Sequence, residues 1–207
     1  MADVYLTLAA AHTAEPPKTK GSRFIGHVAP AADEAAAGAV VEAARKREHA
    51  ARHWCWAFRL GEAGGAWRAS DDGEPSGTGG RPILQEIEGA GLTHVVAVVT
   101  RYYGGTKLGA GGLARAYGEA ARLALHEARA RGLVREVVVR QRLVLHYGFA
   151  DTSAAMRAVD AFDAVVAEQA YTARGGALAL DVRRSEAGPL AAAFVEATAG
   201  RGRVEEG

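Results

Sequence analysis

The sequence predicts an α+β protein of two domains, and three observations support this. The last third of the chain reads as strand, helix, strand, strand, helix, strand, which is the split βαβ or ferredoxin-like order. The first two thirds mix short alternating strands with alanine-rich helical stretches. Residues 132–136 interrupt both patterns. We therefore predict an N-terminal domain over residues 1–132 and a ferredoxin-like domain over residues 136–207.

Strands in the N-terminal domain are predicted where apolar and polar residues alternate, because side chains along a strand point to opposite faces. The last of these segments is continuously apolar, which is typical of a central strand. The strands are 4–8, 24–28, 54–60, 66–70 and 94–100. The helices are 33–52, 83–89 and 111–130, and an irregular loop covers 70–82.

The C-terminal domain begins with a predicted strand over 137–147. A helix follows, capped by Asp151 or Thr152, and then a hairpin of strands 164–172 and 177–182 across Arg174-Gly175-Gly176. Ser185 is predicted to cap a second helix, which Gly200 ends. A short strand over 203–205 completes the pattern.

Composition limits the classes of protein. The chain has 207 residues, of which 49% are hydrophobic and 24% charged, with a net charge of +1. These proportions are typical of a globular protein and exclude nucleic-acid binding through net charge alone. The single cysteine, Cys55, cannot form an intramolecular disulfide and fits a reducing compartment. With no signal-peptide pattern and no apolar run near the ~20 residues that span a bilayer, we expect a cytoplasmic protein without a membrane partner.

The segment 100–117 places five glycines, cations and tyrosines between an apolar strand and a helix. A helix start offers unpaired N–H groups and a partial positive charge, and glycine lets a phosphate approach them. Alternatively, the glycines serve tight turning and close strand–helix packing, and no P-loop Gly-Lys-Ser/Thr follows. Both interpretations stay open. The candidate phosphate-binding residues are Gly104, Gly105, Gly109, Gly111 and Gly112.

Two further clusters raise the question of a metal. The loop residues Asp71, Asp72 and Glu74 offer carboxylate oxygens that suit Mg²⁺, although a solvated turn needs the same residue types. His49 and His53, with Cys55, lack a fourth ligand for structural zinc, and a packed thiol beside ordinary histidines is the better interpretation. We therefore predict no metal and no cofactor, and keep the acidic loop as a candidate site.

The predicted helix over 111–130 carries arginines at seven-residue spacing, which places them in one stripe. Such a stripe can contact phosphate backbones, and neighbouring tyrosines suit stacking on RNA bases. The alternative is an ordinary solvated helix face. The candidate nucleic-acid-binding residues are Arg101, Tyr102, Tyr103, Lys107, Arg115, Arg122 and Arg129.

Several motifs resemble the IMPACT/YigZ family. The longest is the run 98–109, Val-Val-Thr-Arg-Tyr-Tyr-Gly-Gly-Thr-Lys-Leu-Gly, which follows Gly80-x-x-Ile83-Leu84, Ile87 and Leu92. The others are Lys20-Gly-Ser-Arg-Phe24, His53-Trp-Cys-Trp-Ala57 and Ser70-Asp-Asp-Gly-Glu-Pro75. One departure is Cys55, near a position where relatives often carry a second histidine, and this weakens a two-histidine metal site further.

The resemblance covers essentially the whole chain. It implies an N-terminal domain with the fold of the second domain of ribosomal protein S5 and a C-terminal domain resembling the last domain of elongation factor G. Eukaryotic IMPACT proteins regulate translation by competing for the activator of a stress kinase. Bacteria lack that kinase, so the resemblance implies binding to the ribosome or RNA rather than that mechanism.

Two hypotheses of function follow. The first is a non-catalytic, translation-associated protein whose partner is RNA or the ribosome, with a possible protein partner in translation. The second is a nucleotide-using enzyme of the small-molecule-kinase type, in which the glycine turn holds phosphates and the acidic loop holds Mg²⁺. No residues form a nucleophile or metal-pair constellation, so we name no catalytic residue and favour the first hypothesis.

Overall fold

The structure, a computed structural model, describes residues 3–207. Two compact units divide them, Tyr5–Val137 and Val138–Gly207, and residues 3–4 belong to the second. Asp3 packs with the second unit because its carbonyl accepts a hydrogen bond from the Val139 N–H. Its carboxylate accepts from the N–H and the hydroxyl of Ser185. Both helices and strands build the chain, so the predicted α+β class is confirmed.

A five-stranded sheet in the order β2-β3-β6-β4-β5 forms the centre of the first unit, and every neighbouring pair is antiparallel. The central strand is β6, as its continuous apolar sequence predicts. Only β2 was not expected, because three residues are too few to show alternation. The strands are β2 (His12–Ala14), β3 (Arg23–Pro30), β4 (His53–Leu60), β5 (Ala66–Ser70) and β6 (Val95–Tyr102).

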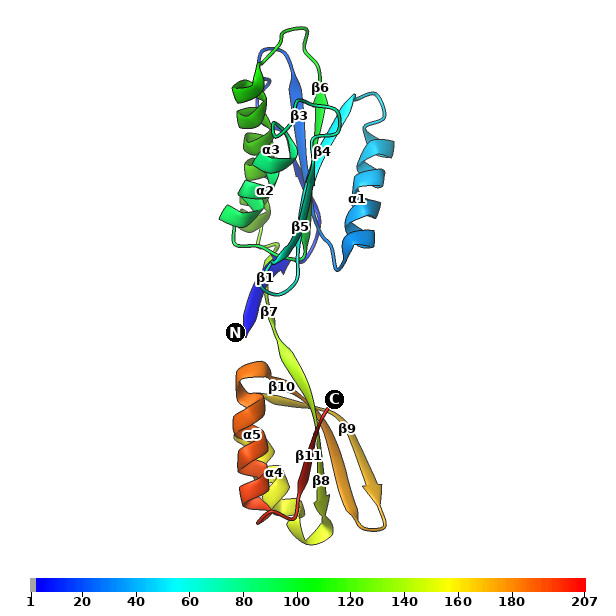
Figure 1. The fold of residues 1–207 in the computed structure, drawn as a ribbon, viewed down its shortest axis with the longest axis vertical. Helices are drawn as coiled ribbons and strands as arrows, with labels where there is room; N and C mark the ends of the chain where they lie inside the picture. Colours follow the sequence, from blue (N-terminus) through cyan, green and yellow to red (C-terminus); the bar gives the residue numbers. More distant parts are fainter. Residues whose placement is uncertain (1–2) are drawn as a thin grey trace. The chain divides into compact units, whose positions relative to one another are not determined.

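Helices cover both faces of this sheet, as Figure 1 shows: α1 (Glu34–Arg47) on one face, α2 (Gly80–Gly89) and α3 (Ala110–Ala130) on the other. The Asp33 carboxylate caps α1 by accepting from the Ala36 N–H at 2.7 Å. The predicted helix over 33–52 is too long, since α1 ends at Arg47. The predicted start of α2 is three residues late, because Gly80 already lies in the helix. Separate apolar clusters fill the two sides of the sheet.

Two further strands, β1 (Val4–Leu8) and β7 (Val134–Val138), form a two-stranded sheet, and all but the first residue of β1 and the last residue of β7 belong to this unit. The predicted strand 137–147 is therefore wrong as one element. It comprises the end of β7 and most of β8 (Arg140–Gly148), which Val139 separates.

The second unit contains the six elements in the predicted order, and its sheet order is β11-β8-β10-β9 with antiparallel neighbours. Helices α4 and α5 lie on one face of this sheet (Figure 1) and cover a buried cluster that includes Leu143, Leu180 and Phe194. After the 3₁₀ turn Phe149–Asp151 come α4 (Thr152–Asp160), β9 (Ala164–Thr172), β10 (Gly175–Arg183), α5 (Arg184–Ala197) and β11 (Arg203–Glu206).

No residue predicted as an N-cap in this unit forms a side-chain cap, although Asp151 does occupy the N-cap position of α4. Ser185 lies inside α5 and donates its hydroxyl hydrogen to Asp3 instead. Asp151 stands at the N-cap of α4, but its carboxylate accepts from the Arg201 guanidinium at 2.5 and 3.1 Å. The Thr152 hydroxyl donates to the Phe149 carbonyl. Asp151 therefore lies before a helix as predicted, but it binds Arg201, a partner 50 residues away that the local sequence does not indicate.

Candidate functional site

The acidic loop between β5 and α2 is folded inward, and Asp71 holds its shape. The Asp71 carboxylate accepts hydrogen bonds from the N–H groups of Gly77, Gly79 and Gly80 at 2.8, 2.8 and 2.9 Å. Burial alone would raise the pKa of Asp71, but these three donors outweigh it and hold the pKa below its ordinary value. The N-cap residue Gly79 has no side chain that could accept from the unpaired N–H groups at the start of α2. Asp71, eight residues earlier, accepts from them instead.

Asp72 is engaged as completely. Its carboxylate accepts from the Arg45 guanidinium at 2.5 Å and from the Trp54 N–H at 2.7 Å. Its carbonyl oxygen lies 2.9 Å from the His53 Nδ1. These contacts tie the loop to α1 and to the first residues of β4.

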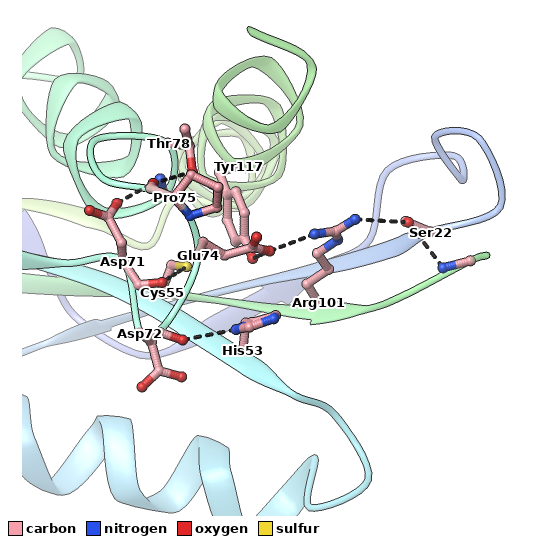
Figure 2. A network of polar contacts seen from close by, with 12 residues as sticks. Ser22, His53, Cys55, Asp71, Asp72, Glu74, Pro75, Thr78, Arg101 and Tyr117 are labelled. Atoms are coloured by element: carbon pink, nitrogen blue, oxygen red, sulfur yellow. Dashed lines mark hydrogen bonds and ion pairs between the residues drawn. The ribbon is translucent and has the colours of Figure 1, made fainter. Parts of the chain in front are cut away.

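Glu74 lies at the centre of a buried polar network, which Figure 2 shows. Its Oε1 accepts from Arg101 and from the Tyr117 hydroxyl, both at 2.7 Å. The Glu74 and Arg101 side chains are only 4% and 7% exposed. A second Arg101 nitrogen lies 3.5 Å from the Ser22 hydroxyl oxygen, which also accepts from the Gly104 N–H. The network joins the acidic loop, β6, α3 and the segment before β3.

This burial corrects one expectation. Arg101 was expected to be displayed at the surface for a nucleic acid, but a side chain paired with a buried carboxylate is not available to phosphates in that way. Burial also raises the pKa of Tyr117 far above its ordinary value, so the phenol remains a hydrogen-bond donor. Asp71, Asp72, Glu74 and Arg101 thus act together as a structural unit.

Cys55 belongs to the same buried region. Its thiol donates to the Asp71 carbonyl at 2.9 Å, and burial raises its pKa to about 12. A thiol with that pKa carries almost no thiolate at neutral pH, so it is a poor nucleophile. Within residues 3–207, no group of three His, Cys, Asp or Glu side chains is arranged to hold a metal ion.

The candidate glycines differ in what the backbone requires of them. A Cβ on Gly104 would lie 1.9 Å from the Gly21 carbonyl carbon, so Gly104 permits two backbone segments to meet. Gly105 and Gly109 have φ of +88° and +71°, which favour glycine. A Cβ on Gly111 would meet only the Arg115 guanidinium, at 3.8 Å, and one on Gly112 would meet Leu108 at 3.2 Å. Packing thus explains Gly104, and backbone conformation explains Gly105 and Gly109, but neither explains Gly111.

Exposed cations gather where α3 starts. The N-cap residue Gly109 provides no side-chain cap, and the first turn of α3 contains no acidic residue. A cavity of about 350 Å³ on one side of this turn is lined by Tyr103, Lys107 and Arg101 among others. A second cavity of about 290 Å³ is lined by Lys20, Arg115 and one carboxylate, that of Glu119, and Leu108 lines both cavities. We call Lys20, Tyr103, Lys107 and Arg115, with the first turn of α3, the α3-start surface.

Other predicted residues do not join this surface. Arg122, which is exposed, pairs with Glu119 at 2.8 Å, and Arg129 donates to the Ala90 carbonyl at 2.8 Å. The Tyr102 hydroxyl donates to Glu48, and the Arg23 guanidinium lies over the Tyr102 ring. The predicted stripe therefore separates into Arg115, which stays near the glycine turn, and two arginines with local partners.

Lys20 was missed as a site residue, although it begins one of the motifs that carry the family resemblance. It comes close to α3 because Gly21 and Gly104 pack backbone to backbone. The sequence offered one signal for this contact. Gly21 and Gly104 each lie in a family motif that also contains a cation, Lys20 in the first and Arg101 in the second. Nothing in the sequence between the two motifs indicates that they meet.

Comparisons with known proteins place this geometry in a family. The model of the Impact N-terminal domain matches residues 20–125. A Thermus thermophilus protein described as an IMPACT family member is 43% identical over 186 residues, which cover 89% of this chain and 97% of that protein. This chain belongs to the IMPACT family.

The IMPACT family member YigZ of Escherichia coli is 44% identical over 110 residues, covering 52% of this chain and 54% of YigZ. A solved crystal structure of a hypothetical protein has a TM-score of 0.66 at 29% identity and covers 99% of this chain and 97% of its own. The match to the IMPACT domain includes the acidic loop, the buried network and the α3-start surface. In the described part of the chain, no helix is both long and apolar enough to cross a membrane.

Proposed function

We propose that this IMPACT family member is a non-catalytic, translation-associated protein of the cytoplasm that binds RNA or the ribosome through its α3-start surface. The observation that supports this is a concentration of positive charge at the positive end of a 21-residue helix. Helix N-termini favour anions, so cations placed there raise the free energy of the unbound protein. A phosphate that binds between them relieves this repulsion.

The contacts of each cation fit this role. Among residues 3–207, Lys20, Lys107 and Arg115 form no ion pair. The Arg115 guanidinium reaches back toward Gly111 in the first turn. Tyr103, which is 52% exposed and lies over Arg101, offers a ring face on which a base can stack. The buried Arg101 Nε, beside the same cavity, has no hydrogen-bond partner in the described residues.

The two-domain organisation gives further support. We infer that the first unit has the fold of the second domain of protein S5 and that the second unit is ferredoxin-like, resembling the last domain of elongation factor G. The strand order β11-β8-β10-β9 is consistent with that second inference. Ribosomal protein S5 and elongation factor G both act at the ribosome, and we therefore propose ribosomal RNA as the first partner to test.

The alternative, an enzyme of the small-molecule-kinase type, is not favoured. Its Mg²⁺ would need free carboxylates next to the glycine turn. The carboxylates of Asp71, Asp72 and Glu74 are all engaged by protein donors. No other observation supports phosphoryl transfer.

RNA binding measured against salt concentration tests the proposal. The probe is a fluorescently labelled single-stranded RNA, and the variant is Lys107→Glu combined with Arg115→Glu. We expect the variant to bind at least tenfold more weakly at low salt. The dependence of log K on log salt should also become shallower, by about 0.7 for each phosphate of the single strand that the variant no longer neutralises.

The matched control is Arg122→Glu combined with Arg129→Glu, which makes the same charge change on the same helix at residues that already have local partners, Glu119 and the Ala90 carbonyl. It should bind within about twofold of the parent, apart from the general effect of net charge. Equal weakening by both variants would leave no role for the α3-start surface. Absence of binding to RNA and to ribosomal subunits at low salt would refute the proposal itself.

A further inference from the structure

A groove of about 340 Å³ lies between α1 and the strands β4 and β5. It is on the face of the sheet covered by α1, whereas the α3-start surface belongs to the helix on the other face (Figure 1). Two aromatic residues line it, the partly exposed Trp56 and the buried Phe58, and their rings are stacked on each other with centroids 5.8 Å apart and planes 9° apart. The size falls within the range of small-molecule sites. Because the Phe58 ring is buried, the ring left for a planar ligand is the partly exposed indole of Trp56.

Gly38 keeps this groove open. It lies in the middle of α1, a helix otherwise rich in alanine, and glycine destabilises a helix interior more than any residue except proline. Packing does not require it, because a Cβ at this position would meet nothing within 4 Å. Its φ is not in the left-handed region. What Gly38 does is line the groove without filling it.

The rim combines carboxylates and guanidinium groups. Glu34, Gly38 and Glu42 follow one another at four-residue spacing, so the two carboxylates flank the glycine on one helix face. Opposite Glu34 stands Arg68, paired with it at 3.0 Å, and the two side chains are 59% and 65% exposed. Such an exposed pair contributes little to stability and retains free lone pairs and donors.

We propose that this groove binds a nucleobase with the hydrogen-bonding edge of guanine. The base would stack on the partly exposed ring of Trp56. A carboxylate such as that of Glu34 can accept from both the ring N1–H and the exocyclic amino group of guanine, and a guanidinium such as that of Arg68 donates to O6 and N7. Adenine offers a carboxylate only its exocyclic amino group and has no O6, so it fits the rim less well.

Titration with guanosine tests this, because the nucleoside has no phosphate and so does not probe the α3-start surface. The chain has three tryptophans, and their indole N–H signals in a ¹H–¹⁵N spectrum give a local readout. We expect the Trp56 signal to shift saturably at millimolar or lower guanosine while that of Trp67, on β5, stays in place. Inosine, which lacks the exocyclic amino group, should bind about tenfold more weakly, and adenosine weaker still.

The variant Gly38→Leu fills the groove at a position with room for a side chain. It should melt no lower than the parent and lose guanosine binding at least tenfold. The matched control Ala39→Leu adds the same side chain at the next residue, which does not line the groove, and should bind like the parent. Glu34→Gln should remove the preference for guanosine over inosine while leaving the fold intact.

Guanosine binding unchanged in Gly38→Leu, equal binding of adenosine, or no saturable shift would each overturn the inference. The base can belong to a free nucleotide or to RNA. If a short guanosine-containing RNA shifts the Trp56 signal at a much lower concentration than guanosine and GTP do, the source is RNA; if GTP shifts it at the same concentration as the RNA, the source is a free nucleotide. The groove and the proposed RNA surface can therefore fail independently, since each has its own variant.

Discussion

The acidic loop and the start of α3 are both charged, both next to glycines and both at the entry to a helix, yet they differ in how their charges are used. In the loop, each carboxylate of Asp71, Asp72 and Glu74 accepts two or three hydrogen bonds from the protein. At the start of α3, Lys107 and Arg115 have no ionic partner in residues 3–207 and lie at the positive end of a helix dipole.

The difference teaches that charge type alone does not identify a binding site. Donors and acceptors that satisfy one another stabilise a fold, and charges that remain unsatisfied in a hollow are available to a ligand. The two regions should accordingly respond to mutation in opposite ways. Changes in the loop should cost stability, and changes at the start of α3 should cost binding.

The largest effect is expected for Glu74→Ala. It leaves the buried Arg101 guanidinium without its counter-charge and the Tyr117 hydroxyl without an acceptor. Removing one partner of a buried ion pair typically costs about 3–5 kcal/mol, and we expect a loss of that size in the free energy of unfolding. Chemical denaturation of both proteins measures it.

Glu74→Gln serves as the control, because its amide oxygen still accepts from both donors although the charge is gone. It should lose clearly less stability than Glu74→Ala. A cost below about 1 kcal/mol for Glu74→Ala would mean that the network is not a structural unit.

A smaller effect, with a defined dependence on pH, is expected for Asp71→Asn. The asparagine keeps one acceptor oxygen for the three loop N–H groups, so we expect a loss of about 1–2 kcal/mol at neutral pH. The pKa of Asp71 is lower in the folded state than its ordinary 3.8, so the unfolded state binds more protons as the pH falls. The stability that the carboxylate contributes is therefore fully present well above pH 3.8 and is lost as the pH drops through the folded pKa.

The measurement is the difference in unfolding free energy between the parent and Asp71→Asn at several pH values. Taking the difference cancels the other acidic groups whose pKa is lowered, such as Asp151 and Asp163. The difference should shrink below about pH 4. A difference that stays constant down to pH 3 would show that the three N–H donors do not favour the charged form.

The sequence predicts the elements of this fold well because most of them are encoded locally. The continuous apolar run of β6 predicts a central strand, and the alternation at 54–60 predicts β4. The two failed helix caps have a common cause. Ser185 and Asp151 look like helix caps in their own sequence, but Asp3 and Arg201, which are 182 and 50 residues away, determine what they bind.

The candidate site is predictable to a similar extent. The glycine turn indicates the correct helix start, since local composition identifies it. Two other features of the site depend on contacts between distant residues. Arg101 is buried because it pairs with Glu74, 27 residues away, and Lys20 lies near α3 because the backbones of Gly21 and Gly104 pack together. The periodicity of the sequence does not indicate which distant residues contact each other. Before the fold is known, a buried arginine such as Arg101 therefore cannot be told from an exposed one such as Arg115.

An effect of similar size and opposite sign is expected at Gly111, the second residue of α3. Gly111→Glu should stabilise the protein by about 1–2 kcal/mol, because it removes a helical glycine, places an anion at the helix N-terminus and lies four residues before Arg115. The Cβ is tolerated, since its nearest neighbour is the end of a flexible side chain.

Gly111→Ala separates the two contributions to this gain. The alanine should stabilise the protein by about 1 kcal/mol through helix propensity alone, and the additional stabilisation by glutamate should fall with added salt. The glutamate should at the same time weaken RNA binding more than the alanine does, because it occupies the place of the phosphate. If glutamate and alanine stabilise equally at low salt, the start of α3 carries no unsatisfied positive charge, and the contrast with the acidic loop disappears.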